Sequence, residues 1–327
     1  QERRCQSQRC QSNHKRDFGI LNKKIMSELE RIIALENQMD IVSPGWRDPI
    51  IIDPTLTKPV YEGVVIQSLT QDYFVFNPAF LLNGKFTVYA RKGNNVIMGT
   101  SNDGLSGWTW RDTNCAYGSI VYMPDLNTFR CSYHKWHFQI HGRCTSFYQG
   151  STNGSAWSDM AYDFTQTSGE DRNLLYDNGL IRNYIRVNPT PRTIGYCESS
   201  NGYTWTPIAE ILKPDSQDIS TLEFYEMSVI KTVRGYFGLL TTYDRATGIV
   251  NVQLAHSVNG KTDWRRLNNR QNFIDRKTGI KQLFGNWSVI GDTAYIYTIE
   301  NVEDHEHGGN HFSCRYKISL TELYKYL

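Results

Sequence analysis

Short runs of apolar and β-branched residues alternate with turn residues from Trp46 to the end of the chain. Four of these runs are followed by the same phrase, Ser-x-Asn-Gly or Ser-x-Asp-Gly, and then by a tryptophan. The runs are residues 95–100, 144–148, 192–197 and 250–255, and their turn glycines are Gly104, Gly154, Gly202 and Gly260. Such runs predict strands, and Asn-Gly or Asp-Gly predicts a hairpin turn because these residues tolerate positive φ. The chain therefore repeats one strand–turn unit.

The spacing of the unit indicates how its copies are arranged. Intervals of 50, 48 and 58 residues separate the four glycines, and a period in this range is typical of a solenoid, a propeller or an array. The tryptophans just beyond the turns are expected to pack between neighbouring sheets; they are Trp108, Trp157, Trp205 and Trp264. We interpret the unit as one blade of a β-propeller. Chance repetition of Asn-Gly and tryptophan is the alternative explanation.

Five blades of about 50 residues account for residues 46–327, whereas six or seven would not fit. The first four blades are expected at 73–110, 116–157, 171–205 and 224–264, and the fifth begins near Phe284. The fifth blade lacks the repeated phrase. We expect the early strand 63–68 to complete this last sheet and close the ring, which leaves only short, protected edges.

A different period precedes the propeller. Residues 1–17 are polar and basic, and residues 18–42 carry apolar side chains at the a and d positions of a heptad, with one fault at Glu28. The apolar positions are Phe18, Leu21, Ile25, Ile32, Leu35, Met39 and Val42. This pattern predicts a coiled-coil helix that would make the protein a homo-oligomer; an amphipathic helix lying on the propeller is the alternative. Pro44 and Gly45 end the helix.

The chain is therefore expected to be all-β, a five-bladed β-propeller preceded by an N-terminal α-helix with heptad character. Residues 1–45 form a polar leader and a coiled-coil-like helix that serve oligomerisation or attachment, and residues 46–327 form the propeller.

Composition narrows the range of partners. The net charge of +2 gives no electrostatic footprint for nucleic acid, and no apolar run approaches the roughly 18 residues of a membrane span. The 20 Tyr, 8 Trp and 14 Phe residues favour strands, and they would also suit stacking against sugar faces. Seven cysteines without a C-x-x-C pair indicate neither zinc nor a disulfide framework. Five of them are expected to be buried in or beside strands: Cys115, Cys131, Cys144, Cys197 and Cys314.

Three carboxylates from three blades are the candidate catalytic residues. In a propeller the starts of the innermost strands surround a central funnel, and this places Asp72, Asp171 and Glu226 around one cavity. Glycoside hydrolysis needs two such groups, one protonated and one ionised. Crowding raises the pKa of at least one of them and so supplies the acid. The alternatives are a solvated turn for Asp72 and an ordinary loop for Asp171.

Further side chains near the same funnel are candidates for substrate binding. Arg91 and Arg186 end the second strands of blades one and three, where a guanidinium could hold a sugar hydroxyl, a carboxylate or a phosphate. The remaining candidates are Asn77, Tyr117, Tyr225, Asn286 and Trp287. Asp177 lies in a distal turn, and we expect it to be structural.

The stretch Asp304-His-Glu-His307, followed by His311, has side chains that bind metals. Gly308 and Gly309 lie between them, so neither a strand nor a helix would fix their geometry. We expect a solvated loop, and the site is predicted to need neither a metal nor a cofactor.

Several of the repeated motifs resemble those of a known group of proteins. Phe76-Asn-Pro-Ala-Phe80 through Val88–Arg91 to Gly99–Gly104 is similar to the first blade of five-bladed glycosidases and β-mannoside phosphorylases. The runs 192–202 and 252–265 resemble later blades of the same superfamily, so the similarity covers most of 70–270. It implies a carbohydrate-active propeller that holds a glycan in the central funnel. The phosphorylases carry a Glu-Asp-Pro-Arg type motif where this chain has Asn114-Cys-Ala-Tyr-Gly118.

Two main functions remain open at this stage. The first is a glycoside hydrolase that uses carboxylate acid/base chemistry on a glycan or polysaccharide. The second is a non-catalytic glycan- or receptor-binding head on an oligomeric stem, as in a viral tail fibre or spike, and this function favours an extracellular or virion-surface location over the cytoplasm. A propeller that binds protein on its top face is a third possibility.

Overall fold

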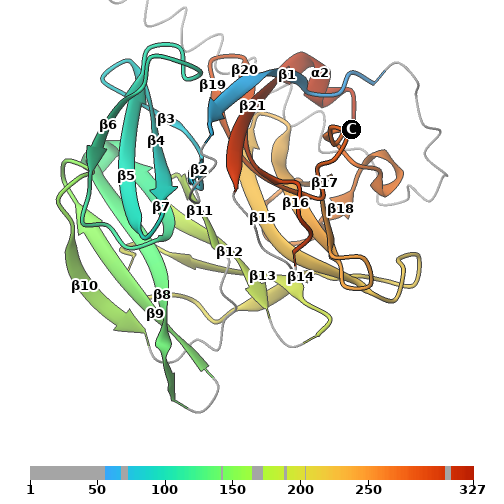
Figure 1. Ribbon diagram of the computed structural model, residues 1–327. Coiled ribbons are helices and arrows are strands. Elements are labelled where there is room, and N and C mark those ends of the chain that lie inside the picture. Colours follow the sequence, from blue (N-terminus) through green and yellow to red (C-terminus); the bar gives the residue numbers. More distant parts are fainter. Residues whose placement is uncertain are drawn as a thin grey trace, which may run out of the picture. The chain divides into compact units, whose positions relative to one another are not determined.

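A computed structural model describes residues 56–67, 73–140, 143–163, 172–187, 190–202, 204–305 and 311–327. Within these ranges, the side chains of 134–140, 143–148, 160–163 and Arg172 are left out of the description. The described chain forms five antiparallel sheets arranged around one axis, as Figure 1 shows. The predicted five-bladed β-propeller is therefore confirmed. The expected heptad helix at 18–42 lies outside the described residues.

Blades one to four consist of strands that are consecutive in the chain, four in each blade with one extra strand in blade one. Blade one contains β2 (Tyr73–Val75), β3 (Phe80–Leu82), β4 (Lys85–Lys92), β5 (Asn95–Ser101) and β6 (Thr109–Asp112). Blade two contains β7 (Gly118–Met123), β8 (Thr128–Ile140), β9 (Arg143–Ser151) and β10 (Ser158–Asp163). Blade three contains β11 (Arg172–Asp177), β12 (Leu180–Val187), β13 (Thr193–Ser199) and β14 (Ala209–Leu212).

The last two blades complete the ring. Blade four contains β15 (Leu222–Thr232), β16 (Gly235–Asp244), β17 (Ile249–Ser257) and β18 (Arg265–Arg266). Blade five contains β19 (Gln282–Ile290), β20 (Thr293–Asn301), β21 (Phe312–Ser319) and β1 (Val60–Ile66), and the short helix α2 (Leu320–Tyr324) follows β21. In blades two to four the outermost strand follows the repeated tryptophan, so these blades extend beyond the ends expected from the sequence.

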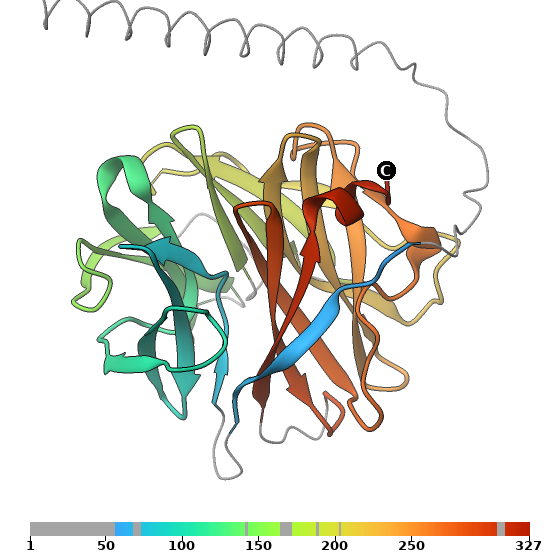
Figure 2. The same cartoon turned by 90° about the horizontal axis from the view of Figure 1, so that it is seen from above.

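Ring closure occurs in blade five. β1 pairs antiparallel with β21, with Val60 opposite Lys317 and Val64 opposite Cys314. In Figures 1 and 2 the blue β1 lies beside the red β21. The expected closure by an early strand is confirmed, although this strand spans 60–66 rather than 63–68. None of the described helices has the length and apolar character that spanning a bilayer requires.

The two faces of the ring differ in their turns. We call the end where the innermost strands β2, β7, β11, β15 and β19 begin the upper face, and the end where they finish the lower face. The four repeated turns connect the third and fourth strands of their blades. They therefore lie on the lower face, and the loops between the second and third strands lie on the upper face.

All four repeated turns have the same hydrogen bonds. The glycine N–H donates to the serine Oγ at distances of 3.0, 2.9, 2.8 and 3.0 Å for Gly104, Gly154, Gly202 and Gly260. Each of these glycines has a φ between 70° and 80°. A Cβ atom at Gly154 would lie 2.7 Å from the Tyr89 hydroxyl. Glycine is therefore required both by the backbone conformation and by the close approach of the neighbouring blade.

Buried tyrosines connect three of these blades to the turns of their neighbours. The Tyr89 hydroxyl donates to the Gly154 carbonyl (2.7 Å), Tyr184 to Gly260 (3.0 Å) and Tyr297 to Gly104 (2.7 Å). Burial raises the pKa of all three phenols well above the ordinary value, so they stay protonated donors. We refer to these contacts as the tyrosine–turn bonds.

Apolar side chains fill the spaces between adjacent blades. Trp157 packs with Tyr89 and Phe129 between blades one and two, and Trp264 packs edge-on against Tyr184 between blades three and four. Trp108 and Trp205 join the clusters at two other junctions. The expected position of the repeated tryptophans is confirmed. Four of the five strand cysteines are buried as expected, namely Cys115, Cys131, Cys197 and Cys314, and the side chain of Cys144 lies outside the description.

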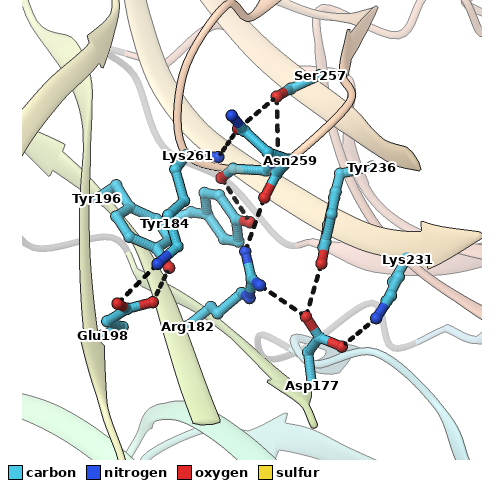
Figure 3. Close-up of polar contacts among 11 residues, drawn as sticks. Asp177, Arg182, Tyr184, Tyr196, Glu198, Lys231, Tyr236, Ser257, Asn259 and Lys261 are labelled. Carbon is cyan, nitrogen blue, oxygen red and sulfur yellow. Dashed lines mark hydrogen bonds and ion pairs between the residues drawn. The ribbon is translucent and has the colours of Figure 1, made fainter. Parts of the chain in front are cut away.

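A buried network of charges joins blades three and four (Figure 3). The Asp177 carboxylate accepts hydrogen bonds from Lys231 (2.7 Å) and Tyr236 (2.6 Å) and forms an ion pair with Arg182 (2.8 Å). Burial opposes its ionisation, but these three partners outweigh burial and hold the pKa of Asp177 below its usual value. Arg182 also donates to the carbonyl of Asn259 in a repeated turn (2.9 Å). The expected structural role of Asp177 agrees with these contacts.

We expect Asp177→Asn to lower the free energy of unfolding by about 3 kcal/mol at pH 7, because two cations lose their buried partner. The folded pKa of Asp177 is lowered, so its contribution is present above the unfolded pKa of about 3.9 and is lost as the pH falls through the folded pKa. The difference between wild type and variant should therefore narrow below about pH 4. Urea unfolding at several pH values measures this difference in unfolding free energy, and Asp112→Asn, at an exposed position, is the control. Equal losses in the two variants would contradict a stabilising role of the Asp177 network.

Gly154→Ala should be more destabilising than Gly84→Ala, although both glycines have a φ of 74°. A Cβ at Gly84 has no neighbour within 4 Å, so its variant loses only about 1 kcal/mol through the left-handed backbone. Gly154→Ala should lose a further 1–3 kcal/mol or so, because the new methyl group meets Tyr89 and Met98. Chemical unfolding compares the two variants, and equal losses would show that the tyrosine–turn bond does not constrain this position.

Candidate functional site

The backbone of β15 presents Tyr225 on the upper face. Phe224 pairs with Thr242 and Glu226 pairs with Thr241, so Tyr225 is the extra residue of a β-bulge. Bulges redirect a side chain and are frequent beside functional sites. In this bulge Tyr225 is only partly buried, at the start of an otherwise apolar innermost strand.

Side chains from three blades meet at this tyrosine. The guanidinium groups of Arg186 and Arg192 lie 4.4 and 5.1 Å from the centre of the Tyr225 ring. The Tyr225 hydroxyl lies 2.8 Å from His305 Nε2, and the rings of Tyr243 and Phe284 stand edge-on to it. We call this group the Tyr225 cluster; it consists of Arg186, Arg192, Tyr225, Tyr243, Phe284 and His305.

A second aromatic–arginine pair lies on blades one and two. The Arg91 guanidinium is 5.2 Å from the centre of the Tyr117 ring, and its Nε donates to the Gly93 carbonyl (2.8 Å). Phe76 supports the other side of Tyr117 through an edge-on contact with a centroid separation of 4.8 Å. Tyr117 is 47% exposed. A large aromatic face therefore meets solvent beside an arginine that is fixed in place.

A buried carboxylate underlies the Tyr225 cluster. Glu223 has no exposed surface, and its Oε2 accepts a hydrogen bond from Arg192 (2.9 Å). Its Oε1 forms an ion pair with Arg245 Nε (3.0 Å). Glu223 therefore pairs with two arginines on the same face, through a hydrogen bond to Arg192 and an ion pair with Arg245.

Of the three predicted catalytic carboxylates, only Glu226 is described. It is partly buried beside Tyr225, and the hydroxyl of Thr241 donates to it at 3.4 Å. Asp72 and Asp171 lie outside the described residues, so their distances from Glu226 stay untested.

The structure brings four of the seven predicted binding residues to the upper face, namely Arg91, Tyr117, Arg186 and Tyr225. Asn77 is buried between blades one and two, where its Oδ1 accepts from the Ile120 N–H (2.6 Å) and its Nδ2 donates to the Gly118 carbonyl (3.2 Å). Asn286 is 2% exposed on β19. Neither residue contacts the Tyr225 cluster in the described contacts.

Trp287 lies nearer the lower face. Its indole N–H donates to the Ser228 carbonyl (2.9 Å), and its ring lines an apolar cavity of about 530 Å³ at the lower ends of the innermost strands. Other aromatic residues that line this cavity are Phe80, Tyr122 and Tyr176. The structure thus gives Trp287 a place in the packing between blades four and five.

Several residues of the site were not among the sequence-based candidates. Arg192, Tyr243 and His305 belong to the Tyr225 cluster, and Arg245 lies beside it. In the sequence, the charged residue Arg192 stands next to an apolar strand run, and this is the local feature that could have marked it as a site residue. His305 had been assigned to a solvated loop, but it packs against Tyr225 and Tyr243. Among the described residues, which exclude 306–310, no group of three side chains could hold a metal ion.

Comparison with solved structures identifies proteins of the same fold. A thermostable family-43 glycoside hydrolase has a TM-score of 0.59 at 12% identity over 74% of this chain and 88% of its own. The α-L-arabinofuranosidase PaAbf62A from Podospora anserina, in complex with cellotriose, has a TM-score of 0.59 at 12% identity over 81% of this chain and 98% of its own.

An N-acetylgalactosamine deacetylase from F. plautii, in complex with blood group B trisaccharide, has a TM-score of 0.55 at 10% identity, over 81% of this chain and 95% of its own. No family model and no curated protein matches the sequence. Identities this low establish a shared fold and leave function to the site. The chain is structurally similar to the five-bladed β-propeller glycoside hydrolases.

Proposed function

We propose that the upper face of the propeller binds a glycan. The observation that carries the proposal is the Tyr225 cluster together with the Arg91–Tyr117 pair, in which aromatic faces and guanidinium groups from several blades occupy one end of the ring. Aromatic rings pack against the apolar faces of sugars, and arginine N–H groups donate to sugar oxygens. The similar structures include an arabinofuranosidase in complex with cellotriose and a deacetylase in complex with a blood group trisaccharide, which also supports a glycan as the ligand.

The contacts within the site favour tight binding. Tyr225 is held by His305 and by two arginines, and Arg192 is held by Glu223. Side chains that are already ordered lose less conformational entropy when a ligand binds. The cluster is therefore suited to recognise a particular sugar arrangement rather than to adapt to many.

Hydrolysis is the second proposed function, and Glu226 is its best candidate. It directly follows Tyr225 on β15, so a sugar stacked on that ring would lie near its carboxylate. The reaction needs a second carboxylate, for which Asp72 and Asp171 remain the predicted partners. The separation is expected to be about 5–5.5 Å for a retaining enzyme and about 6.5–9.5 Å for an inverting one.

A binding head on an oligomeric stem is the non-catalytic alternative. The described chain enters the propeller at the lower end, where the Thr57 carbonyl accepts a hydrogen bond from Tyr326 (3.1 Å). In this alternative residues 18–42 would form the stem, and the upper face of the propeller would bind a surface glycan without cleaving it. An extracellular or virion-surface location would suit this arrangement.

Tyr117→Ala should weaken glycan binding about tenfold, since loss of an aromatic contact costs about 1–1.5 kcal/mol. Binding is measured on immobilised arabinan, xylan, cello-oligosaccharides and blood group oligosaccharides. Tyr61→Ala is the matched control, because Tyr61 is 44% exposed against 47% for Tyr117 but lies on the outermost strand of blade five. Retention of no glycan by the wild type, or equal losses in the two variants, would count against the proposal.

If the site is catalytic, Glu226→Gln should reduce the rate of sugar release about 10²- to 10⁴-fold while binding is kept, because the amide cannot exchange a proton. Reducing-sugar assays on the same panel give the rates, and the exposed Glu210→Gln serves as the control. Binding by the wild type without any release of sugar would exclude hydrolysis on that panel and favour the binding head.

A further inference from the structure

Glu223 is shared by two arginines that reach solvent. One carboxylate oxygen is 2.9 Å from Arg192 Nη1 and the other is 3.0 Å from Arg245 Nε. The side chain of Glu223 is fully buried, whereas those of Arg192 and Arg245 are 29% and 45% exposed. The buried carboxylate is therefore the shared ion-pair partner of two partly exposed guanidinium groups.

Each arginine keeps donors for a ligand. A guanidinium has five N–H groups, and among the described residues each of the two arginines makes one polar side-chain contact, which is to Glu223. Arg192 additionally faces the Tyr225 and Tyr243 rings at 5.1 and 5.9 Å. The remaining N–H groups have no acceptor among the described residues, and those of Arg192 lie beside the Tyr225 ring.

Among the described residues, the charged groups around this pair are equal in number, with four cations (Arg186, Arg192, Arg245 and Lys281) and four carboxylates (Glu223, Glu226, Asp244 and Asp304). Arg186 adds a third guanidinium beside Tyr225, and Glu226 adds a second carboxylate. Asp244, next to Arg245, already accepts from the Thr221 and Thr247 hydroxyls (2.6 and 2.7 Å) and from the Ala246 N–H (3.0 Å). The other nearby acid, Asp304, lies 3.7 Å from Lys281.

The ion pairs are not needed to hold the loops that carry these arginines. The Phe224 N–H already donates to the Arg192 carbonyl (3.0 Å), and the Arg245 N–H donates to the Thr221 carbonyl (3.1 Å). Backbone bonds therefore fix both segments beside β15. What Glu223 adds is the orientation of the two guanidinium groups, and a fixed pair of guanidinium groups matches an anionic group that accepts two or more hydrogen bonds.

From this arrangement we infer that the site selects an acidic glycan, one that carries carboxylate or sulfate groups, and that Arg192 and Arg245 bind the anionic group. The inference rests on the proposed glycan binding of the upper face. In this arrangement the sugar ring packs on Tyr225, and its acidic substituent projects towards the two arginines. A neutral sugar offers no charged acceptor to their remaining N–H groups.

Paired polymers that differ only in charge test the inference. Polygalacturonate is compared with its methyl ester for carboxylate recognition, and dextran sulfate is compared with dextran for sulfate recognition. The wild type should bind at least one acidic polymer about tenfold more tightly than its neutral partner, and this preference should shrink as ionic strength rises. Arg192→Gln and Arg245→Gln should each reduce the ratio of acidic to neutral affinity about tenfold.

The control is Arg265→Gln, because Arg265 is exposed on β18, the outermost strand of blade four. A loss of preference in this variant equal to that in Arg245→Gln would assign the effect to net charge and overturn the inference. Equal wild-type affinity for acidic and neutral polymers would overturn it while leaving glycan binding intact. Failure of the wild type to bind acidic or neutral polymers alike would overturn the proposed function as well.

Discussion

The hydrogen bond from a buried tyrosine hydroxyl to a glycine carbonyl of the next blade is the contact on which the ring depends. It occurs at Tyr89, Tyr184 and Tyr297, each time on the second strand of a blade and each time to the repeated turn of its neighbour. The serine and the Asn or Asp of the turn fix the position of that carbonyl. A local motif of four residues therefore sets the position of one whole sheet relative to the next. The relative positions of the side chains on the upper face depend on this placement of the sheets.

The two faces of the propeller perform different tasks. The lower face holds the repeated turns, the tyrosine–turn bonds and the ion network around Asp177, all of which connect blades. The upper face holds the connections from each blade to the next, and its charged side chains are arranged around Tyr225 and Glu223. Because stability is concentrated at one end, the loops at the other end can differ between proteins of this fold without loss of the ring.

The sequence predicted the fold well because its signals are local. The strand runs, the turn residues and the repeat period each follow from a few neighbouring residues, and so does closure by an early strand. The predicted ends of the blades were less accurate, because an outermost strand such as β18 has only two residues and so has no hydrophobic pattern to detect. The sequence could place Tyr225 and Arg186 at the central funnel. Glu223 and Arg192, however, are 31 residues apart, and only the packing of blade three against blade four brings them together.

Closure by β1 has a consequence for synthesis of the chain. β1 leaves the ribosome before every other strand of the ring, yet its partner β21 is the last of these strands to be made. Until then β1 lacks its native edge, and Val60, Tyr61 and Val64 stay more than 40% exposed even in the finished ring. Assembly of the whole circle therefore waits for the synthesis of β21, and a chain that stops before β21 leaves an open sheet edge that other chains can pair with.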